Sequence, residues 1–260
     1  MSERGTSHRE LLGFRDGEKG VHSSRTLMVV ELEQLLGATS PEEDMTGFRR
    51  AVVIENVLGK RTATTREHTV RKLKALYALD PAVPVYRIMR RLWDDDSLGR
   101  PLLALLCAIA RDPLLRASVD AVLEAPLGTV VLPEKLAETV RASFSESTRD
   151  AIVSHLLSTW TLAGFLSTGA TKTRIRARAT PGAAAYALAL GLMEGGRGSL
   201  LLTTPWTRLL DCPPDEVLNL VRLAARRGWV EYRAAGDVMD LRVEALLTED
   251  ERRWCDGQQS

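Results

Sequence analysis

The spacing of apolar residues constrains the fold of this chain most strongly. Through most of the sequence, apolar residues recur every three or four positions, which is the period of an amphipathic helix. Met28, Leu32, Leu35 and Leu36 are one such stripe, and Gly37 closes it. Glycine and proline interrupt the pattern at short intervals. The sequence therefore predicts a mainly α protein built of many short helices.

The chain of 260 residues is long enough for two or three small domains. Residues 1–22 are polar and charged, and we expect them to form a flexible tail. Helical periodicity then predicts a bundle-like N-terminal domain over residues 23–111, with a helix at about 44–58 and a helix-turn-helix-like element whose second helix begins near Thr64.

The remaining chain predicts two winged-helix modules in tandem, at 112–180 and 181–260. The first begins with Asp112 as N-cap and Pro113 at the first helical position. Each module has the order helix, short strand, helix, helix, hairpin. The strands are expected at 129–132 and 171–180 in the first module, and at 199–202, 229–233 and 238–243 in the second.

Two segments echo each other. Thr62-Ala63-Thr64-Thr65-Arg66-Glu67 resembles Ser145-Glu146-Ser147-Thr148-Arg149-Asp150, and the pairs Leu73/Leu156 and Tyr77/Trp160 follow at equal distances. Thr64 and Ser147 are the expected N-caps, with Glu67 and Asp150 completing capping boxes. Common descent of two helix-turn-helix units explains the echo, and so does the general pattern of any well-capped amphipathic helix.

Basic residues gather in three places although the net charge is only +1. Between Lys60 and Lys74 the local charge is 6 − 1 = +5. Acidic residues collect elsewhere, as in Asp94-Asp95-Asp96. This segregation is typical of a surface that binds phosphate. The predicted contacts in this first cluster are Lys60, Arg61, Arg66, Arg71, Lys72 and Lys74.

The second cluster is Lys172, Arg174, Arg176 and Arg178. In a strand these four side chains would share one face, so we predict that they lead phosphate contact. The alternative is a solvated outer face of a hairpin. The third cluster is Asn219, Arg222 and Arg226, on a helix that begins near Pro214. Arginine and asparagine suit base edges, although a solvated helix face is an equal interpretation.

Several classes of protein find no support. Cys107, Cys212 and Cys255 are far apart and form no C-x-x-C pair, which fits a reducing, cytoplasmic compartment. No secretory signal precedes the helices, and 151–171 is too polar for a membrane span. No nucleotide-binding loop or hydrolase motif occurs, and no histidine–carboxylate cluster has metal spacing. We therefore expect no enzyme, cofactor or metal.

A set of short fragments between about residues 20 and 180 carries a family resemblance. The most specific is Arg111-Asp112-Pro113-Leu114-Leu115-Arg116. Others are Ser24-Arg25-Thr26-Leu27-Met28, Asn56-Val57-Leu58-Gly59-Lys60 with Thr64-Thr65-Arg66, Leu76-Tyr77-Ala78-Leu79, Arg100-Pro101-Leu102-Leu103-Ala104-Leu105, and Thr159-Trp160 with Gly164-Phe165-Leu166. Together they resemble the BrxA family of bacteriophage exclusion (BREX) defence systems. The resemblance implies a helical, non-enzymatic accessory protein that binds DNA and supports phage restriction and host methylation by other BREX components.

The expected partners are therefore double-stranded DNA and other BREX subunits. Two alternatives stay open. The winged helices could dock partner subunits without touching DNA, so that the basic clusters meet an acidic protein surface. The chain could instead bind RNA, although few aromatic residues are available for base stacking.

Overall fold

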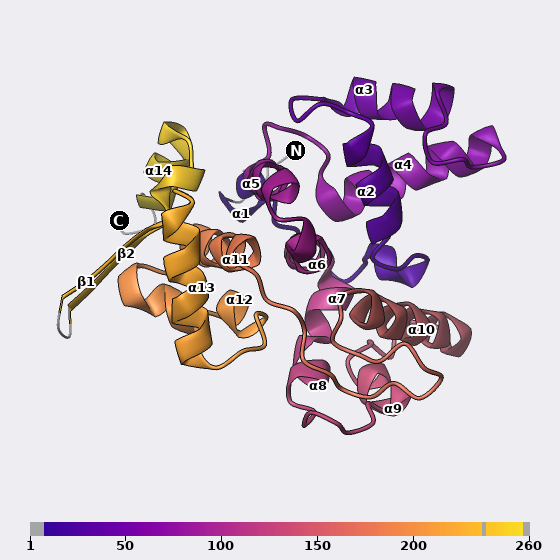
Figure 1. Ribbon diagram of the computed structural model, residues 1–260. Coiled ribbons are helices and arrows are strands. Elements are labelled where there is room, and N and C mark those ends of the chain that lie inside the picture. The colour runs from indigo at the N-terminus through magenta and orange to yellow at the C-terminus, as the bar shows by residue number, and fades with distance from the viewer. Residues whose placement is uncertain (1–7, 236–237, 257–260) are drawn as a thin grey trace, which may run out of the picture.

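The computed structural model describes residues 8–235 and 238–256, and this part of the chain is mainly α-helical (Figure 1). Its α-helices are α1 His8–Leu12, α2 Val29–Gly37, α3 Met45–Arg49, α4 Ala63–Tyr77, α5 Pro84–Asp95, α6 Arg100–Arg111, α7 Pro113–Ala117, α8 Val119–Leu123, α9 Pro133–Ala137, α10 Glu146–Leu162, α11 Pro181–Met193, α12 Pro205–Arg208, α13 Pro214–Arg226 and α14 Glu249–Asp256. The other helical elements are the 3-10 helices η1 Val21–Ser23, η3 Ser97–Gly99, η4 Gly198–Thr203 and η5 Glu244–Leu246 and the π-helix η2 Arg50–Ile54.

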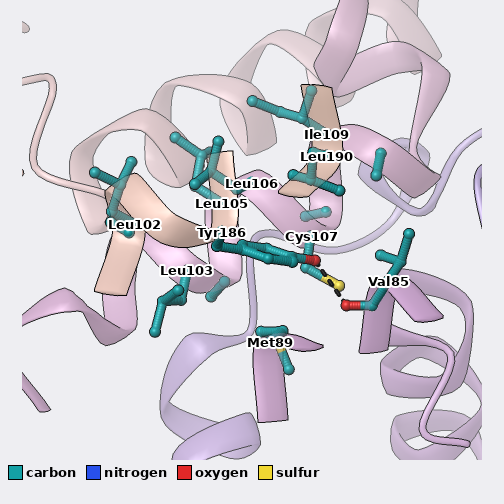
Figure 2. Packing of buried hydrophobic residues seen from close by; sticks show 14 of the residues in the cluster. Val85, Met89, Leu102, Leu103, Leu105, Leu106, Cys107, Ile109, Tyr186 and Leu190 are labelled. Atoms are coloured by element: carbon teal, nitrogen blue, oxygen red, sulfur yellow. Dashed lines mark hydrogen bonds between the residues drawn. The ribbon is translucent and has the colours of Figure 1, made fainter. Parts of the chain in front are cut away.

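The core is continuous across the predicted boundary between residues 180 and 181. Helix α11 is buried from Gly182 to Met193, and it packs against α5 and α6 as well as α12 and α13. Tyr186 lies among leucines of α6, and its hydroxyl donates to the carbonyl of Val85 in α5 at 2.8 Å (Figure 2). Because α11 is shared in this way, the segment after residue 180 is not packed as an isolated unit.

The N-terminal segment is packed from His8 onward, which corrects the expected flexible tail over residues 1–22. Leu12, Phe14, Val21 and His22 are buried, and the backbone N–H of Arg15 donates to the carbonyl of Ala110 at 3.0 Å. Residues 1–7 lie outside the described part of the chain. The segment is held by a few well-spaced apolar anchors, which its polar composition conceals.

The predicted helix at 44–58 forms, but it ends earlier and changes geometry. Asp44 caps α3 by accepting from the N–H groups of Thr46 and Gly47, and the chain then continues as the π-helix η2 to Ile54. The left-handed backbone of Asn56, with φ of 54°, ends the helical run. Its side chain accepts from the N–H of Lys60 at 2.8 Å, which fixes the loop before α4.

The predicted strand at 171–180 is wrong as a regular element. Only Thr173 and Arg174 of this range form bridges in the described chain, with Val130 and Leu166 respectively. The backbone N–H of Val131 donates to Lys172 and that of Ser167 donates to Thr173, at 2.8 and 2.9 Å. Three short extended segments therefore lie side by side, and the chain beyond them runs as an irregular linker to α11.

The C-terminal part contains the one sheet of the described residues. Strands β1 Glu231–Ala235 and β2 Val238–Arg242 are antiparallel, with Tyr232 opposite Leu241. They correspond to the hairpin predicted at 229–233 and 238–243, shifted by two residues in its first strand. The strand predicted at 199–202 is wrong, because these residues form the 3-10 helix η4, which lies beside β2.

No helix in the described part of the chain has both the length and the apolarity needed to cross a membrane.

Candidate nucleic-acid interface

Arg174 is a buried structural residue, which corrects its predicted role in phosphate contact. Only 2% of the residue is exposed, and its guanidinium binds both carboxylate oxygens of Asp211, at 2.6 and 2.9 Å. Its Nε donates to the carbonyl of Val122 at 3.0 Å. The buried guanidinium therefore links the middle segment to the loop after α12 and is not available to phosphate in the solvent.

The other three cations of this segment do not share one face with Arg174. Arg176 and Arg178 are exposed, whereas Lys172 is half-buried, with Nζ 3.5 Å from the carbonyl of Ser167. Burial and the nearby carboxylates of Glu216 and Asp211 raise the pKa of Cys212 to about 11, and Arg176 partly offsets this effect. Arg176 thus stands near acidic groups. The alternation in the sequence did not produce a single cationic strip, because the segment is not a regular strand.

Two residues of the Lys60–Lys74 cluster are also structural. Lys60 pairs with Glu31 at 3.0 Å. Arg66 donates to the carbonyls of Lys60 and Val53, both at 3.1 Å, and thereby ties α4 to the preceding loop and π-helix. Arg66 is half-buried, and these carbonyls hold its Nε and Nη1 against the protein; its phosphate contact stays a prediction.

The rest of this cluster remains accessible on α4 or just before it. Arg61, Arg71 and Lys74 are exposed, and Lys72 is half-buried. Lys74 lines a surface hollow that also contains three acids, Glu10, Asp16 and Asp80, and two further cations, Arg15 and Arg111. Arg71 donates to Nδ1 of His68 at 2.9 Å. Neither Arg71 nor Lys72 forms an ion pair among the described residues.

Arg25 was missed by charge clustering but belongs with these residues. Burial and the positive charges of Arg71 and Arg25 lower the pKa of Lys72, and the negative charge of Asp112 partly offsets this. Arg25 is exposed, and its guanidinium contacts the carbonyl of Ser24. In the sequence it is a single cation flanked by serine and threonine, so no local charge pattern reveals it.

The third predicted cluster, on α13, is exposed to solvent, as its helical spacing predicts. Asn219, Arg222 and Arg226 are exposed on α13, whose buried stripe is Val217, Leu220, Val221 and Ala224. The Arg222 guanidinium lies over the Tyr232 ring, 5.7 Å from its centre. This contact joins the exposed face of α13 to the adjoining hairpin. Asp215 and Glu216 occupy the first turn of the helix and are also exposed, so the cationic surface is confined to its later turns.

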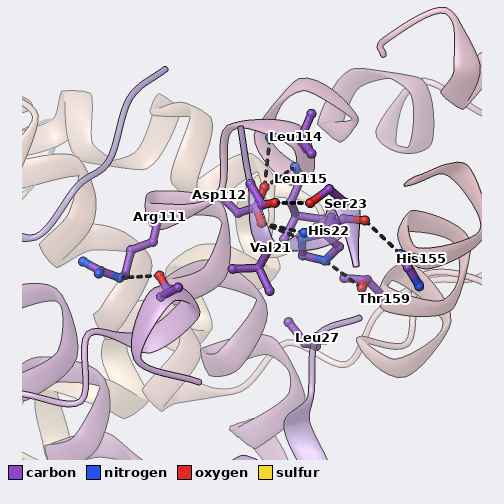
Figure 3. Close-up of polar contacts among 12 residues, drawn as sticks. Val21, His22, Ser23, Leu27, Arg111, Asp112, Leu114, Leu115, His155 and Thr159 are labelled. Carbon is purple, nitrogen blue, oxygen red and sulfur yellow. Dashed lines mark hydrogen bonds and ion pairs between the residues drawn. The ribbon is translucent and has the colours of Figure 1, made fainter. Parts of the chain in front are cut away.

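The Arg111–Arg116 string forms a structural junction. Asp112 caps α7, since its Oδ1 accepts from the N–H groups of Leu114 and Leu115 at 2.9 and 3.2 Å. Its Oδ2 accepts from both the backbone N–H and Nδ1 of His22, at 3.0 and 2.9 Å (Figure 3). Arg111 reaches the carbonyls of Gly13 and Ala75. The string thus joins the N-terminal segment, α4 and α7.

His22 also bonds to α10, which produces a carboxylate–imidazole–hydroxyl series. Its Nε2 lies 2.8 Å from the Thr159 hydroxyl, and its carbonyl is 2.9 Å from Nδ1 of His155 (Figure 3). The series Asp112–His22–Thr159 has the order of a hydrolase triad. All three residues are 0% exposed, however, so no substrate reaches the hydroxyl without unfolding. These bonds satisfy buried polar groups and fix η1 between α7 and α10.

The echo between α4 and α10 persists in three dimensions, with a correction to the caps. Thr62 and Ser145, rather than Thr64 and Ser147, cap the two helices by accepting from the N–H three residues later. Arg149 repeats the role of Arg66, since it donates to the carbonyl of Ala137 at the end of the preceding helix at 3.4 Å. Tyr77 and Trp160 are both 0% exposed, as expected for core residues.

No known protein-family model matches the sequence, and no curated protein matches it either.

Proposed function

We propose that this chain is a non-enzymatic DNA-binding protein, and that it serves as an accessory component of a BREX anti-phage system. The exposed face of α13 carries the DNA-binding part of the proposal. Asn219, Arg222 and Arg226 lie on this face, and none of them has an ion-pair partner among the described residues. The BREX assignment rests on the family resemblance of residues 20–180.

A winged-helix interpretation of the C-terminal segment supports this use of α13. Helices α11, α12 and α13 precede a hairpin, and η4 occupies the place beside β2 where a winged helix has its first strand. In that family of folds the second helix of the helix-turn-helix enters the major groove. Arginine and asparagine on its exposed face can donate to guanine and adenine edges. We assign α13 as that helix.

The middle segment, residues 112–180, supports a second winged-helix module whose corresponding helix exposes no arginine. Its bridged segments at 128–131, 165–167 and 173–175 take the places of the three strands, and α9 and α10 take those of the helix-turn-helix. The exposed face of α10 carries Ser147, Asp150 and Ser154 rather than arginine. We therefore propose that α10 contributes less to DNA affinity than α13.

Measuring affinity as a function of salt tests the proposal. The purified chain should bind duplex DNA, and log Kd should change with log salt by about 0.9 per phosphate neutralised. Arg222→Ala with Arg226→Ala should weaken binding and flatten this slope by about 1 for each phosphate that the variant no longer neutralises. The matched control is Arg50→Ala with Arg141→Ala, because both arginines are exposed and already pair with Glu55 and Glu18.

Single-stranded DNA and RNA serve as competitors in the same assay. Preference for either would replace the duplex proposal with one of single-strand or RNA recognition. Absence of any nucleic-acid binding at low salt would contradict the DNA-binding function altogether.

A protein-interaction scaffold is the second candidate function, and an apolar edge of the middle segment favours it. Leu127, Val130, Leu132 and Ile175 are 50, 49, 53 and 41% exposed. Clusters of exposed apolar side chains mark protein contacts more often than nucleic-acid contacts. Replacing Val130 and Leu132 with serine should leave DNA affinity unchanged and should disrupt assembly with partner subunits if this surface docks them.

A further inference from the structure

Three cations from two distant parts of the sequence lie near the place where α4, η1 and α10 pack together. Element η1 contacts both helices, and Arg25 lies two residues after its end. Arg71 and Lys72 are neighbours on α4, and the positive charges of Arg71 and Arg25 both act on Lys72. None of the three forms an ion pair in the described part of the chain. The junction therefore concentrates positive charge, which the buried Asp112 carboxylate offsets only in part at Lys72.

The backbone that carries Arg25 is anchored on both sides. Three residues before it, His22 is fully buried and is bonded to Asp112 of the α7 cap and to Thr159 of α10 (Figure 3). Two residues after it, the carbonyl of buried Leu27 accepts from the Tyr77 hydroxyl of α4. Arg25 is consequently held between α4 and α10 without a large loss of backbone freedom on binding, which is the condition for a preorganised site.

We infer that Arg25, Arg71 and Lys72 form a site for backbone phosphates of duplex DNA, separate from the face of α13. The inference rests on the proposed DNA-binding function and adds a second contact surface to it. In Figure 1, α4 and α10 lie on one side of the molecule and α13 with its hairpin on the other. Neighbouring like charges repel one another, and a phosphate bound between them reduces that repulsion. Exposed arginine and lysine suit phosphate oxygens, and such contacts position a protein without reading sequence.

A phosphate bound at this site would stabilise the charged form of Lys72, which is partly buried. Burial removes some of the water around its ammonium group, and the adjacent arginines disfavour its charged form, so that its pKa is lowered. A bound phosphate reverses both effects by supplying hydrogen-bond acceptors and negative charge. Lys72 should therefore be the lysine whose environment changes most when DNA binds at this junction.

Differential acetylation of lysines tests this directly on the full-length protein. With saturating duplex DNA, mass spectrometry should show a severalfold loss of acetylation at Lys72. Lys135 is the internal control, because it is exposed and pairs with Glu138 at 3.1 Å. Loss of acetylation at Lys172 with no change at Lys72 would overturn the inference and would favour binding through the extended segments of the middle part.

Substitutions separate a ligand site from a structural one. Arg25→Ala with Arg71→Ala should weaken binding to all duplex sequences alike and flatten the salt slope by about 2, with an unchanged melting temperature. Arg25→Glu should weaken DNA binding further while keeping or raising the melting temperature, because the new carboxylate relieves repulsion at Lys72. A purely structural role for Arg25 predicts that melting temperature and affinity fall together, which would also overturn the inference.

The outcomes distinguish this inference from the proposed function. If the wild-type chain binds no duplex DNA, both are wrong. The wild-type chain could instead bind duplex DNA, with the Arg222/Arg226 variant impaired and the Arg25/Arg71 variant equal to the wild type in affinity and salt slope. In that case only the junction site is wrong. Loss of an acidic protein partner in the Arg25/Arg71 variant, with intact DNA affinity, would assign the junction to protein binding and overturn the phosphate site.

Discussion

Replacing Arg174 with alanine tests whether this arginine is structural or contacts a ligand. The substitution removes both ion-pair bonds to Asp211 and the donor to the Val122 carbonyl, and it uncovers the ring of Phe165, which the guanidinium overlies at 5.3 Å. Removing one partner of a buried ion pair typically costs about 3–5 kcal/mol. Because the Asp211 side chain is 14% exposed and can be partly rehydrated, we expect the lower end, ~3 kcal/mol.

Calorimetric melting of matched variants measures this cost. For a chain of this size, ~3 kcal/mol corresponds to a decrease of about 6–12 °C in melting temperature. Arg178→Ala is the control, because Arg178 belongs to the same segment but is exposed. A double-mutant cycle with Asp211→Ala should show strong coupling between the two positions. An Arg174→Ala variant that melts like the wild type but binds DNA more weakly would refute the structural role and would favour phosphate contact by this arginine.

Three further predictions concern the buried junctions. Trp160→Ala should lower the free energy of unfolding by about 3–5 kcal/mol, because the side chain is 0% exposed, and unchanged thermal melting would contradict its place in the core. Burial raises the pKa of Asp112, but the hydrogen bonds and charge of His22 outweigh burial and hold this pKa below the usual 3.8. The ionised carboxylate therefore stabilises the fold at pH values above 3.8. This stabilisation is lost as the pH falls through the lowered pKa. The stability advantage of wild type over Asp112→Asn, measured by urea unfolding from pH 7 to pH 3, should therefore shrink with acid. Burial raises the pKa of Cys107 to about 11, so iodoacetamide at pH 8 should label it only after the protein is unfolded.

Local sequence patterns determined the helices and the exposed face of α13. Capping side chains and prolines at first-turn positions act within a few residues, so Asp112-Pro113 could be assigned to the start of α7 from the sequence alone. The apolar stripe of α13 likewise defined which face is buried, and Asn219, Arg222 and Arg226 followed on another. The echo of α4 and α10 was visible for the same reason, although each cap lies two residues earlier than predicted.

Only the tertiary structure determined which individual cations are buried in ion pairs and which are exposed. Alternation predicted that Lys172, Arg174, Arg176 and Arg178 share a face, but this requires regular strand pairing, and only short bridges form. The carboxylate of Asp211, 37 positions away in the sequence, forms an ion pair with Arg174. Periodicity describes the direction in which a side chain points, whereas its burial depends on which distant element covers that direction.

Long-range packing also brought together residues that no local sequence pattern connects. Arg25 is placed beside α4 because His22 and Leu27 are anchored to different helices, and the sequence does not encode either pairing locally. Residues 199–202 similarly suit a strand but form η4 beside β2. The sequence by itself indicated most of the helical segments and which helix faces are polar, since these depend on neighbouring residues. Only the tertiary structure decided which charges are neutralised and which remain to bind a partner, because electrostatic pairing depends on distance in space and not along the chain.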